Sequence, residues 1–542
     1  MVTRVARCAL STGAVLLIAA GLPLLGPGDA SADSQISFRR TVLADQKAYG
    51  EPSLALSDDG KHIAVCVPGG AGQTSDWFSA DQGKTFGTSH TTSQHGGGDC
   101  ELDFLPDGTL LNADLRITDS AIRYSKDHGA TWQGTATAGV EQDRQWFAHS
   151  KDGKTAYLVY HDFAAEGEFY AQSNDGGLTW PAALSAQPVN GADQVTAPGR
   201  AGTPASGTSA SLIDQGGNTF SGPMLISPDG RDTYVLYSIS DLGSNLTGGT
   251  PPYGATRGIV VAHKGGEATS FTNRYAVTSD GTAVNGAIFP WGAVDTAGTV
   301  YVMYNSDAGA PGHFHTYYLF STDKAAHWSQ PVKVDGAPLA RGAQIYATGD
   351  AGAPGVLDLA WYGHQGTGGA SDPAAVWDIN FAQVRNATSA HPIITRSSVA
   401  PGDPIHKGNI CLNGLLCILG GDRSLADFIE LQIGKDGMAN IAYANNARAF
   451  TGSKGRVIFA KQTSGPSAYA ATGTAATRTR AGVDAQRAGV HATGSAGVLP
   501  VALAGASSGA ARLAATGLDG VLPGAGIVLA MGVVVARRRR SA

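Results

Sequence analysis

The feature that most constrains the fold is an eight-residue pattern, Ser-x-Asp-x-Gly-x-Thr-Trp, that recurs along the chain. Two copies are complete and two are degraded: SKDHGATW at Ser125 to Trp132, SNDGGLTW at Ser173 to Trp180, SADQGKTF at Ser79 to Phe86, and STDKAAHW at Ser321 to Trp328. Asp side chains bond turn amides, Gly supplies positive φ and Trp packs sideways. Four copies with one spacing indicate a repeated turn rather than a single chemical site.

A longer repeat surrounds this pattern. Seven times, a strand-like run leads through a tight turn to a second strand, and a third strand often follows and runs into the eight-residue pattern. Clear examples are SLALSDDGKHIAVCV, LDFLPDGTLLNADL, WFAHSKDGKTAYLVYH, MLISPDGRDTYVLYS and IELQIGKDGMANIAYA, with looser copies in WGAVDTAGTVYVMYN and YATGDAGAPGVLDLAWYG. Such sheets cannot bury both faces alone, so they must pack on one another in a closed ring. The sequence therefore predicts an all-β fold, a β-propeller of four-stranded antiparallel blades, with ISFRRTVLA as the outer strand of the last blade.

The eight-residue spacing resembles the Asp-box, or BNR repeat, of the sialidase-like β-propellers of the neuraminidase superfamily. In that family the box is a hairpin turn on the face away from the active site, which implies structural roles for Asp81, Asp127 and Asp175. Counting hairpins gives seven blades, and six, the number in the sialidases proper, is the alternative.

Composition agrees with this class. The 542 residues include 74 Gly and 8% aromatic residues, which suits turn-rich β structure. Lys plus Arg number 38 against 44 Asp plus Glu, a formal charge of -6. This balance argues against nucleic acid as a partner.

Both ends of the chain carry targeting patterns. Residues 1–32 read as a secretory signal peptide, with Arg4 and Arg7, an apolar run and an Ala-Ser-Ala site before Asp33. Residues 464–512, rich in Ala, Gly, Ser and Thr, are expected to form a disordered stalk behind a propeller at 33–463.

Residues 513–542 resemble an LAxTG sortase sorting signal of actinobacterial cell-wall proteins. The matching positions are Leu513, Thr516 and Gly517, followed by an apolar transmembrane-type segment and the basic run Arg537 to Arg540. An apolar segment stopped by arginines holds a chain in the membrane with the arginines inside. We expect a secreted protein at the cell surface, joined by sortase to peptidoglycan; a plain membrane tail is the alternative.

Four cysteines remain after the signal peptide, in an oxidising compartment where disulfides persist. The short spacing of Cys411 and Cys417 favours a local staple, which leaves Cys66 to pair with Cys100. Metal binding by thiolates is the weaker interpretation.

The propeller geometry sorts the polar residues by face. Asp-Gly turns and Asp-boxes should lie on one side, so the ligand-binding side should hold residues before the first strand and after the second strand of each blade. Residues before the first strands are Glu51, Asp99, Glu101, Asp103, Asp143, Arg144, Arg341, Gln344, Tyr346, Arg423 and Asp427. Residues after the second strands are Asp114, Arg116, His161, Asp162, Asp307, His313, His315 and His364.

Alternation places Asp99, Glu101 and Asp103 on one strand face, where a cation, an arginine or shared protons must relieve their repulsion. Calcium could serve, and an acid pair is a second option. The structural alternative is that Asp99 caps the turn while Glu101 and Asp103 meet arginines of neighbouring blades. His313 and His315 have metal-ligand spacing without a third ligand in view.

Arg144, Arg341 and Arg423 occupy the same structural step in three blades and could converge on one anion, since guanidinium groups grip carboxylates bidentately. With Asp99 and Asp427 they form the predicted substrate-binding set. The sialidase resemblance implies a Tyr nucleophile paired with a Glu and an Asp acid/base. Tyr346, Glu101 and Asp143 would then be the catalytic residues.

One departure from the family concerns its Arg-Ile-Pro motif. The corresponding place reads Phe38-Arg39-Arg40-Thr41, with no Ile-Pro after the arginine. Two functions follow: an exo-α-sialidase-like glycoside hydrolase of an acidic sugar, or a non-catalytic propeller that binds glycan or protein. A calcium-dependent polysaccharide lyase is a third.

Overall fold

The computed structural model of the chain describes residues 35–470, with internal gaps. The gaps are 44–49, 69–73, 88–89, 92–97, 117–118, 139–141, 163–166, 181–186, 189–194, 197–218, 241–255, 279–282, 287–288, 309, 340, 413–421 and 447–455. The predicted signal peptide, the sorting signal and nearly all of the predicted stalk therefore lie outside the described residues.

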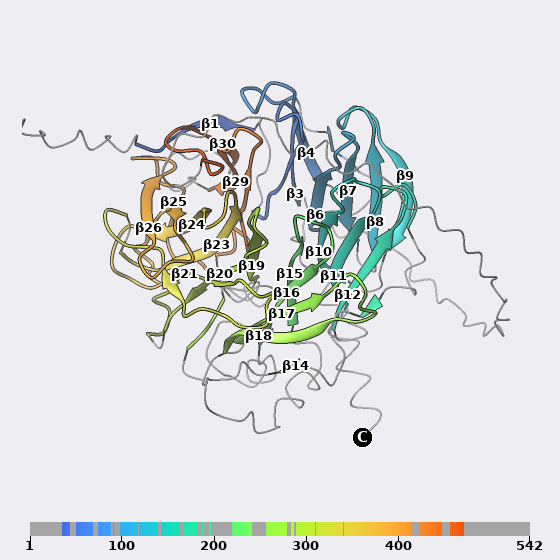
Figure 1. Cartoon of the computed structure of the whole chain (residues 1–542). Coiled ribbons are helices and arrows are strands. Elements are labelled where there is room, and N and C mark those ends of the chain that lie inside the picture. The colour runs from blue at the N-terminus through green and yellow to red at the C-terminus, as the bar shows by residue number, and fades with distance from the viewer. Residues whose placement is uncertain are drawn as a thin grey trace, which may run out of the picture.

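Seven antiparallel sheets stand around a common centre, so the propeller prediction is confirmed and the count is seven rather than six (Figure 1). The first three blades are blade 1, with β2 (Ser53–Leu56), β3 (Ile63–Pro68), β4 (Thr74–Ser79) and β5 (His90–Thr91); blade 2, with β6 (Cys100–Phe104), β7 (Leu110–Leu115), β8 (Ser120–Ser125) and β9 (Gln133–Ala138); and blade 3, with β10 (Gln142–His149), β11 (Ala156–Asp162), β12 (Gly167–Ser173) and β13 (Gln187–Pro188).

The other four blades follow the same order. They are blade 4, with β15 (Thr219–Ile226), β16 (Thr233–Ser240), β17 (Thr256–Lys264), β18 (Thr272–Thr278) and the added parallel β14 (Val195–Thr196); blade 5, with β19 (Trp291–Val294), β20 (Val300–Ser306), β21 (His315–Ser321) and β22 (Val332–Lys333); blade 6, with β23 (Gln344–Ala351), β24 (Leu357–His364), β25 (Val376–Arg385), β26 (Ile393–Ser398) and β27 (His406–Lys407), which pairs with β25; and blade 7, with β28 (Glu430–Ile433), β29 (Ala439–Asn445), β30 (Arg456–Ser464) and β1 (Ser37–Val42). The first strands of successive blades, from β2 to β28, contact one another around the axis.

The ring is closed by the first strand of the propeller. β1 pairs antiparallel with β30, from Ser37 opposite Ser464 to Val42 opposite Ile458. This confirms the role predicted for ISFRRTVLA. Blade 7 therefore takes its three inner strands from the end of the propeller sequence and its outer strand from the beginning.

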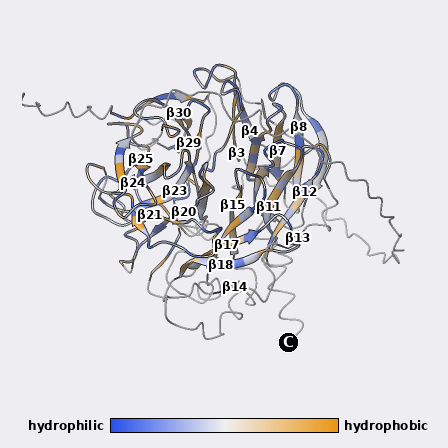
Figure 2. Cartoon of the chain, viewed as in Figure 1, coloured by the Kyte–Doolittle hydropathy of each residue, from blue (hydrophilic) through white to orange (hydrophobic). Residues whose placement is uncertain are grey.

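Packing between blades explains why the second strands are so apolar. β7, β20, β24 and β29 are buried along their whole length because neighbouring sheets cover both of their faces. At the junction of blades 7 and 1, for example, Trp77 and Val65 pack against Phe459 and Ala442. Figure 2 shows apolar residues within the strands of the blades. Within the described part of the chain, no helix is long and apolar enough to cross a membrane.

The eight-residue patterns form closed turns between the third and fourth strands. In the copy that follows β8, Ser125 Oγ donates to Asp127 Oδ1 at 2.7 Å, and Asp127 accepts bonds from the amide and hydroxyl of Thr131 at 2.7 and 2.6 Å. These bonds lower the pKa of Asp127 to about 2. Copies at Asp81 and Asp175 make the same bonds. These carboxylates are committed to the turns.

The degraded copy keeps this geometry with a different side chain. His327 replaces the Thr, and its amide and ring Nδ1 lie 2.9 and 2.6 Å from the two carboxylate oxygens of Asp323. Residues of the Asp-Gly turns meet the boxes of the next blade: the His62 ring stacks on His128 with centroids 3.6 Å apart. Both kinds of turn therefore share one face of the ring, which we call the Asp-box face.

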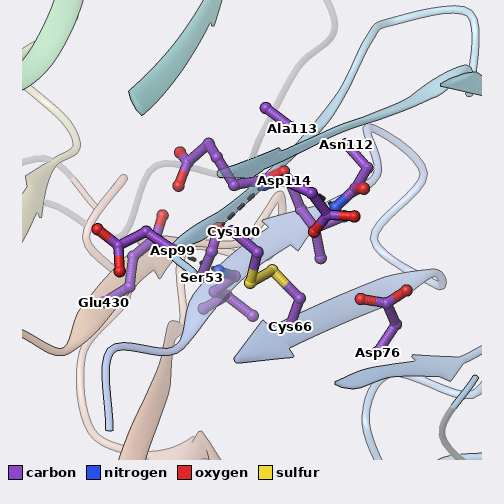
Figure 3. The surroundings of a disulfide bond; sticks show 12 residues. Ser53, Cys66, Asp76, Asp99, Cys100, Asn112, Ala113, Asp114 and Glu430 are labelled. Atoms are coloured by element: carbon purple, nitrogen blue, oxygen red, sulfur yellow. Dashed lines mark hydrogen bonds between the residues drawn. A yellow bond between two sulfur atoms is a disulfide. The ribbon is translucent and has the colours of Figure 1, made fainter. Parts of the chain in front are cut away.

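A disulfide joins Cys66 of β3 to Cys100 of β6, which confirms that pairing and shows that it links blades 1 and 2 (Figure 3). Cys411 is also disulfide-bonded, whereas Cys417 lies outside the described residues. Beside the first bridge, at the same junction, Asp76 and Asp114 are both completely buried. Their carboxyl groups lie near the guanidinium of Arg123, with Nη2 3.0 Å from Asp114 Oδ2 and 3.9 Å from Asp76 Oδ2.

Candidate functional site

Three polar residues at the starts of the innermost strands have a positive φ, which residues other than Gly seldom adopt. The angles are 61° at Glu51, 35° at Arg144 and 56° at Tyr346. The register of the blade shifts at Arg144 and again at Tyr346, so both lie in β-bulges. Bulges redirect side chains, and strained backbone gathers at functional sites. These positions make this end of the axis, opposite the Asp-box face, the place to look for a site.

Five residues from four blades come together there. We call them the inner-strand cluster: Glu51, Asp99, Tyr346, Arg423 and Asp427. Arg423 donates from Nη1 to Asp427 Oδ1 at 3.0 Å and from Nη2 to Asp427 Oδ2, and its Nη2 lies 3.4 Å from Glu51 Oε1. Glu51 and Asp427 are buried, Asp99 is half-buried, and the Arg423 side chain is 28% exposed. Arg423 and Asp99 are therefore the members that solvent reaches most easily.

The electrostatics of the cluster set its protonation. Burial raises the pKa of Glu51 well above its ordinary value, the carboxylates of Asp99 and Asp427 add to the rise, and Arg423 opposes it. Burial also raises the pKa of Asp427, while its bonds to Arg423 act in the opposite direction. Burial and the neighbouring carboxylates therefore favour the protonated form of Glu51, which can donate a hydrogen bond to Asp99, and Asp427 is the partner of the guanidinium.

Tyr346 supplies the hydroxyl of the cluster. Its side chain is 4% exposed, and its buried hydroxyl has no hydrogen-bond partner within the described residues. Burial raises the pKa of Tyr346 well above its ordinary value, and the neighbouring charges are Asp427, Arg423 and Glu51. A buried phenol without a partner is costly. The geometry thus leaves one hydrogen-bond donor uncommitted beside two carboxyl groups and a guanidinium.

A second polar layer lies deeper on the axis. Arg144 is 1% exposed and donates to the carbonyls of Cys100 and Gln145 at 3.0 and 2.9 Å and to Glu101 Oε2 at 2.8 Å. Burial raises the pKa of Glu101 to about 7, against the lowering effect of Arg144. Glu430 is also buried there, and its Oε2 accepts the amide of Leu54 at 2.7 Å.

Aromatic rings fill the axis around this layer. The Arg144 guanidinium lies 3.8 Å from the Trp146 ring centre and 4.3 Å from that of Phe428. Trp146 meets Trp291 edge to face at 5.1 Å, and Phe289 meets Phe428 at 5.8 Å. The axis is therefore packed with side chains at this level and does not form an open channel. The rings support Phe428, which adjoins Asp427 in the sequence.

The structure gives the three predicted clamp arginines three different surroundings. Arg144 is sealed in the deeper layer, Arg423 belongs to the cluster, and Arg341 is exposed. Of these three arginines, only Arg423 is both part of the cluster and accessible to solvent. Of the predicted catalytic residues, Tyr346 lies in the cluster and Glu101 pairs with Arg144, while the side chain of Asp143 lies outside the described residues.

The three acids predicted to share a strand face find separate partners. Glu101 meets Arg144, and Asp103 Oδ2 lies 2.8 Å from His149 Nδ1, both in blade 3, while Asp99 lies beside Glu51. The alternative of an ion pair with an arginine of a neighbouring blade thus describes Glu101, whereas the partner of Asp103 is a histidine. The described residues hold no group of three or more His, Cys, Asp or Glu side chains placed to bind a metal ion.

The histidines of the predicted polar set are likewise dispersed. His161 Nδ1 lies 3.0 Å from Glu168 Oε1, His315 Nδ1 lies 2.9 Å from Asp335 Oδ2, and His313 is exposed. His161 and Glu168 are cross-strand neighbours in blade 3 and both are fully buried. Sequence reasoning placed Glu51 on this side without a role and overlooked Glu430 and Phe428. Phe428 and Glu430 lie before and at the start of β28, a position similar to that of Glu101 in blade 2. That position could have identified them from the sequence.

Two hollows lie elsewhere, on the Asp-box face. One, of about 250 Å³, lies between blades 7 and 1, and its lining includes Asp59, His62 and Lys461. The other, of about 260 Å³, lies between blades 2 and 3, and its lining includes Lys126, Asp152 and Asp175. Both are shallow junctions between turns whose aspartates are already committed. The strained backbone and the uncommitted phenol favour the inner-strand cluster as the site.

Comparison with known proteins gives structural likeness without a sequence relative. No protein-family profile matches the chain, and no curated protein sequence matches it. A PL25 polysaccharide lyase, an ulvan lyase bound to a disaccharide unit, is similar with a TM-score of 0.45 and 12% identity over 78% of this chain and 95% of that one.

Two further glycan-active enzymes are also similar. The GH93 α-L-arabinofuranosidase of Fusarium graminearum has a TM-score of 0.37 and 14% identity over 61% of this chain and 92% of its own. The intramolecular trans-sialidase of Ruminococcus gnavus has a TM-score of 0.35 and 11% identity over 74% and 92%. What this chain does must be argued from its own residues.

Proposed function

We propose that the chain is a glycan-processing enzyme, a glycoside hydrolase of the sialidase-like type, that works at the inner-strand cluster. The observation that carries this proposal is the uncommitted Tyr346 hydroxyl, buried beside Glu51, Asp427 and Arg423 on strained backbone. Exo-α-sialidase action on sialic acid or a similar acidic sugar is the specific form that the Asp-box resemblance suggests.

The cluster holds the two carboxyl groups that glycoside hydrolysis requires. Glu51, whose pKa is raised by burial and by the neighbouring carboxylates, is suited to give its proton to the leaving glycosidic oxygen. Asp427, an acceptor held by Arg423 close to Glu51, is suited to take the proton of the Tyr346 hydroxyl. Tyr346 would donate a hydrogen bond to the sugar, or, if its proton passes to a carboxylate, would attack the anomeric carbon itself.

One observation favours a second candidate, a non-catalytic propeller that binds glycan or protein. Arg144 is sealed between two aromatic rings, so it cannot reach a ligand carboxylate without repacking the axis. A preformed three-arginine clamp would therefore need other residues. Binding without turnover by a well-folded protein would select this candidate.

The test is turnover of a panel of fluorogenic glycosides, one sialoside and several uncharged sugars, by the purified full-length chain. We expect Tyr346→Phe to lower kcat/KM by at least a hundredfold, because it removes the donor without changing the ring. Tyr157→Phe, a half-buried tyrosine of blade 3, is the matched control and should leave activity unchanged. Equal loss in both variants, or none in either, would refute the assignment.

We also propose that the protein works outside the cell, attached to peptidoglycan through the LAATG segment. The support is the sequence pattern at Leu513, Thr516 and Gly517. Mass spectrometry of muramidase-released wall fragments should find the chain ending at Thr516 in amide linkage to a peptidoglycan peptide. Recovery of the intact C-terminus from the membrane fraction would instead support the plain membrane tail.

A further inference from the structure

The inner-strand end of the axis contains more acids than bases. The cluster contains three carboxyl groups and one guanidinium: Glu51 and Asp427 contact Arg423, both terminal nitrogens of Arg423 already face Asp427, and Asp99 lies beside Glu51. Below it, two more carboxyl groups, Glu101 and Glu430, share Arg144.

Protonation does not remove this excess. Even with Glu51 protonated, the cluster holds the carboxyl groups of Asp99 and Asp427 against the single guanidinium of Arg423. In the layer below, Glu101 pairs with Arg144. The inner-strand cluster therefore keeps one more carboxylate than it has guanidinium groups.

We infer that the sugar ring bound in the inner-strand cluster carries no carboxylate. This rests on the proposed function and narrows it, because it assigns an uncharged sugar as the substrate rather than a sialic or uronic acid. A ligand carboxylate would have to compete with Asp427 for Arg423 while facing Asp99 at close range. Like charges in a partly buried, weakly screened site repel strongly.

The hydrogen-bonding inventory fits an uncharged ring. Sugar hydroxyls donate and accept, so they can donate to Asp99 and Asp427 and accept from the Tyr346 hydroxyl. Tyr346 would then gain the partner that its buried hydroxyl lacks in the described structure. A ligand carboxylate accepts only, so it could use Tyr346 and Arg423, but it would have to take Arg423 from Asp427 and could donate nothing to the cluster's own carboxylates.

The experiment compares matched pairs of glycosides that differ only in the acid group. Suitable probes are the methylumbelliferyl α-sialoside and its methyl ester, the β-glucuronide and the β-glucoside, and the α-galacturonide and the α-galactoside. Binding to the full-length chain is measured by calorimetry at low and at high salt, and hydrolysis by fluorescence. In every pair that binds, we expect the uncharged member to bind at least tenfold more tightly at low salt. This affinity ratio, called the gap below, should be smaller at high salt.

Charge variants test whether the cluster causes the discrimination. Asp99→Asn removes one negative charge without removing a group assigned to proton transfer, and should reduce the gap about tenfold. Asp103→Asn, on the same strand but paired with His149, should leave it unchanged. An unchanged gap in Asp99→Asn would overturn the inference, because the discrimination would then come from elsewhere.

The outcomes separate this inference from the proposed function. Tighter binding and hydrolysis of an acidic member would overturn the inference while leaving the hydrolase intact. Tighter binding of an uncharged member without hydrolysis would support the inference and replace the hydrolase by the binding candidate. Failure of the folded protein to bind any member would overturn both.

Discussion

Replacement of Asp76 by Asn should stabilise the protein, and more so as the pH rises. Asp76 is completely buried at the junction of blades 1 and 2, and neither of its carboxylate oxygens has a hydrogen-bond partner within the described residues. Burial, reinforced by Asp114 and opposed by Arg123, raises its pKa from 3.8 to about 8. The folded protein therefore keeps a proton there that the unfolded chain releases above pH 4.

The sign and size follow from proton linkage. Between pH 4 and 8 the folded state binds one more proton than the unfolded state, so the free energy of unfolding falls as pH rises. The slope is about 1.4 kcal/mol per pH unit, and the full effect at pH 8 is on the order of 5 kcal/mol. Asp76→Asn removes the titrating group, so the gain over wild type should be near zero at pH 4 and largest at pH 8.

Urea unfolding of both proteins at pH 4, 6 and 8, with the disulfides intact, measures the difference. Glu267→Gln, at an exposed acid in the same fold, is the control and should show no such trend. A gain from Asp76→Asn that does not grow with pH would refute the reasoning. It would mean that Asp76 is ionised in the folded protein and that Arg123 compensates for its burial.

Three further changes test the packing. Replacing both Cys66 and Cys100 by Ser should lower the free energy of unfolding by about 3 to 4 kcal/mol, as expected for a cross-link over 34 residues. Unfolding with and without reductant checks this, because reductant should destabilise the variant much less than the wild type. Gly83→Ala should lower the melting temperature by several degrees, since Gly83 has a φ of 72° and an added Cβ would come within 2.0 Å of a ring of blade 7; no change in calorimetry would contradict that contact. Arg144→Met should lower the free energy of unfolding by about 3 to 5 kcal/mol, because Glu101 is left buried without its partner. Adding Glu101→Gln to this variant should recover part of the loss. If Arg144 were instead an accessible clamp arginine, the change would alter ligand affinity and not stability.

The sequence predicted the architecture better than the site, and particular residues show why. The hairpins and boxes could be counted because their turn chemistry is local: Asp127 bonds within six residues of itself. Ring closure could be predicted because the sequence has an extra strand before the first blade and needs an outer strand for the last one. These inferences needed only the spacing of the sequence repeats and the residues that form the turns.

The site depends on backbone angles that no pattern reveals. Arg144 and Tyr346 occupy the same predicted step, yet a bulge turns Arg144 into the aromatic interior, while Tyr346 faces the cluster. Glu51 is distant in sequence from the other members of the inner-strand cluster, yet in space it neighbours residues of blades 2, 6 and 7. Such pairings arise from the ring as a whole.

The closure of blade 7 also governs the order in which the molecule can form. Ser37 meets Thr463 and Ser464 across sequence separations of 426 and 427 residues, so the other blades of the propeller must be synthesised before the first strand can pair. Closing so long a loop is slow and must precede the contacts that reward it. Until then β30 offers an unpaired edge to any other chain. The hydroxyl, charged and amide side chains along β1 and β30 suit an edge that spends time exposed before its own partner arrives.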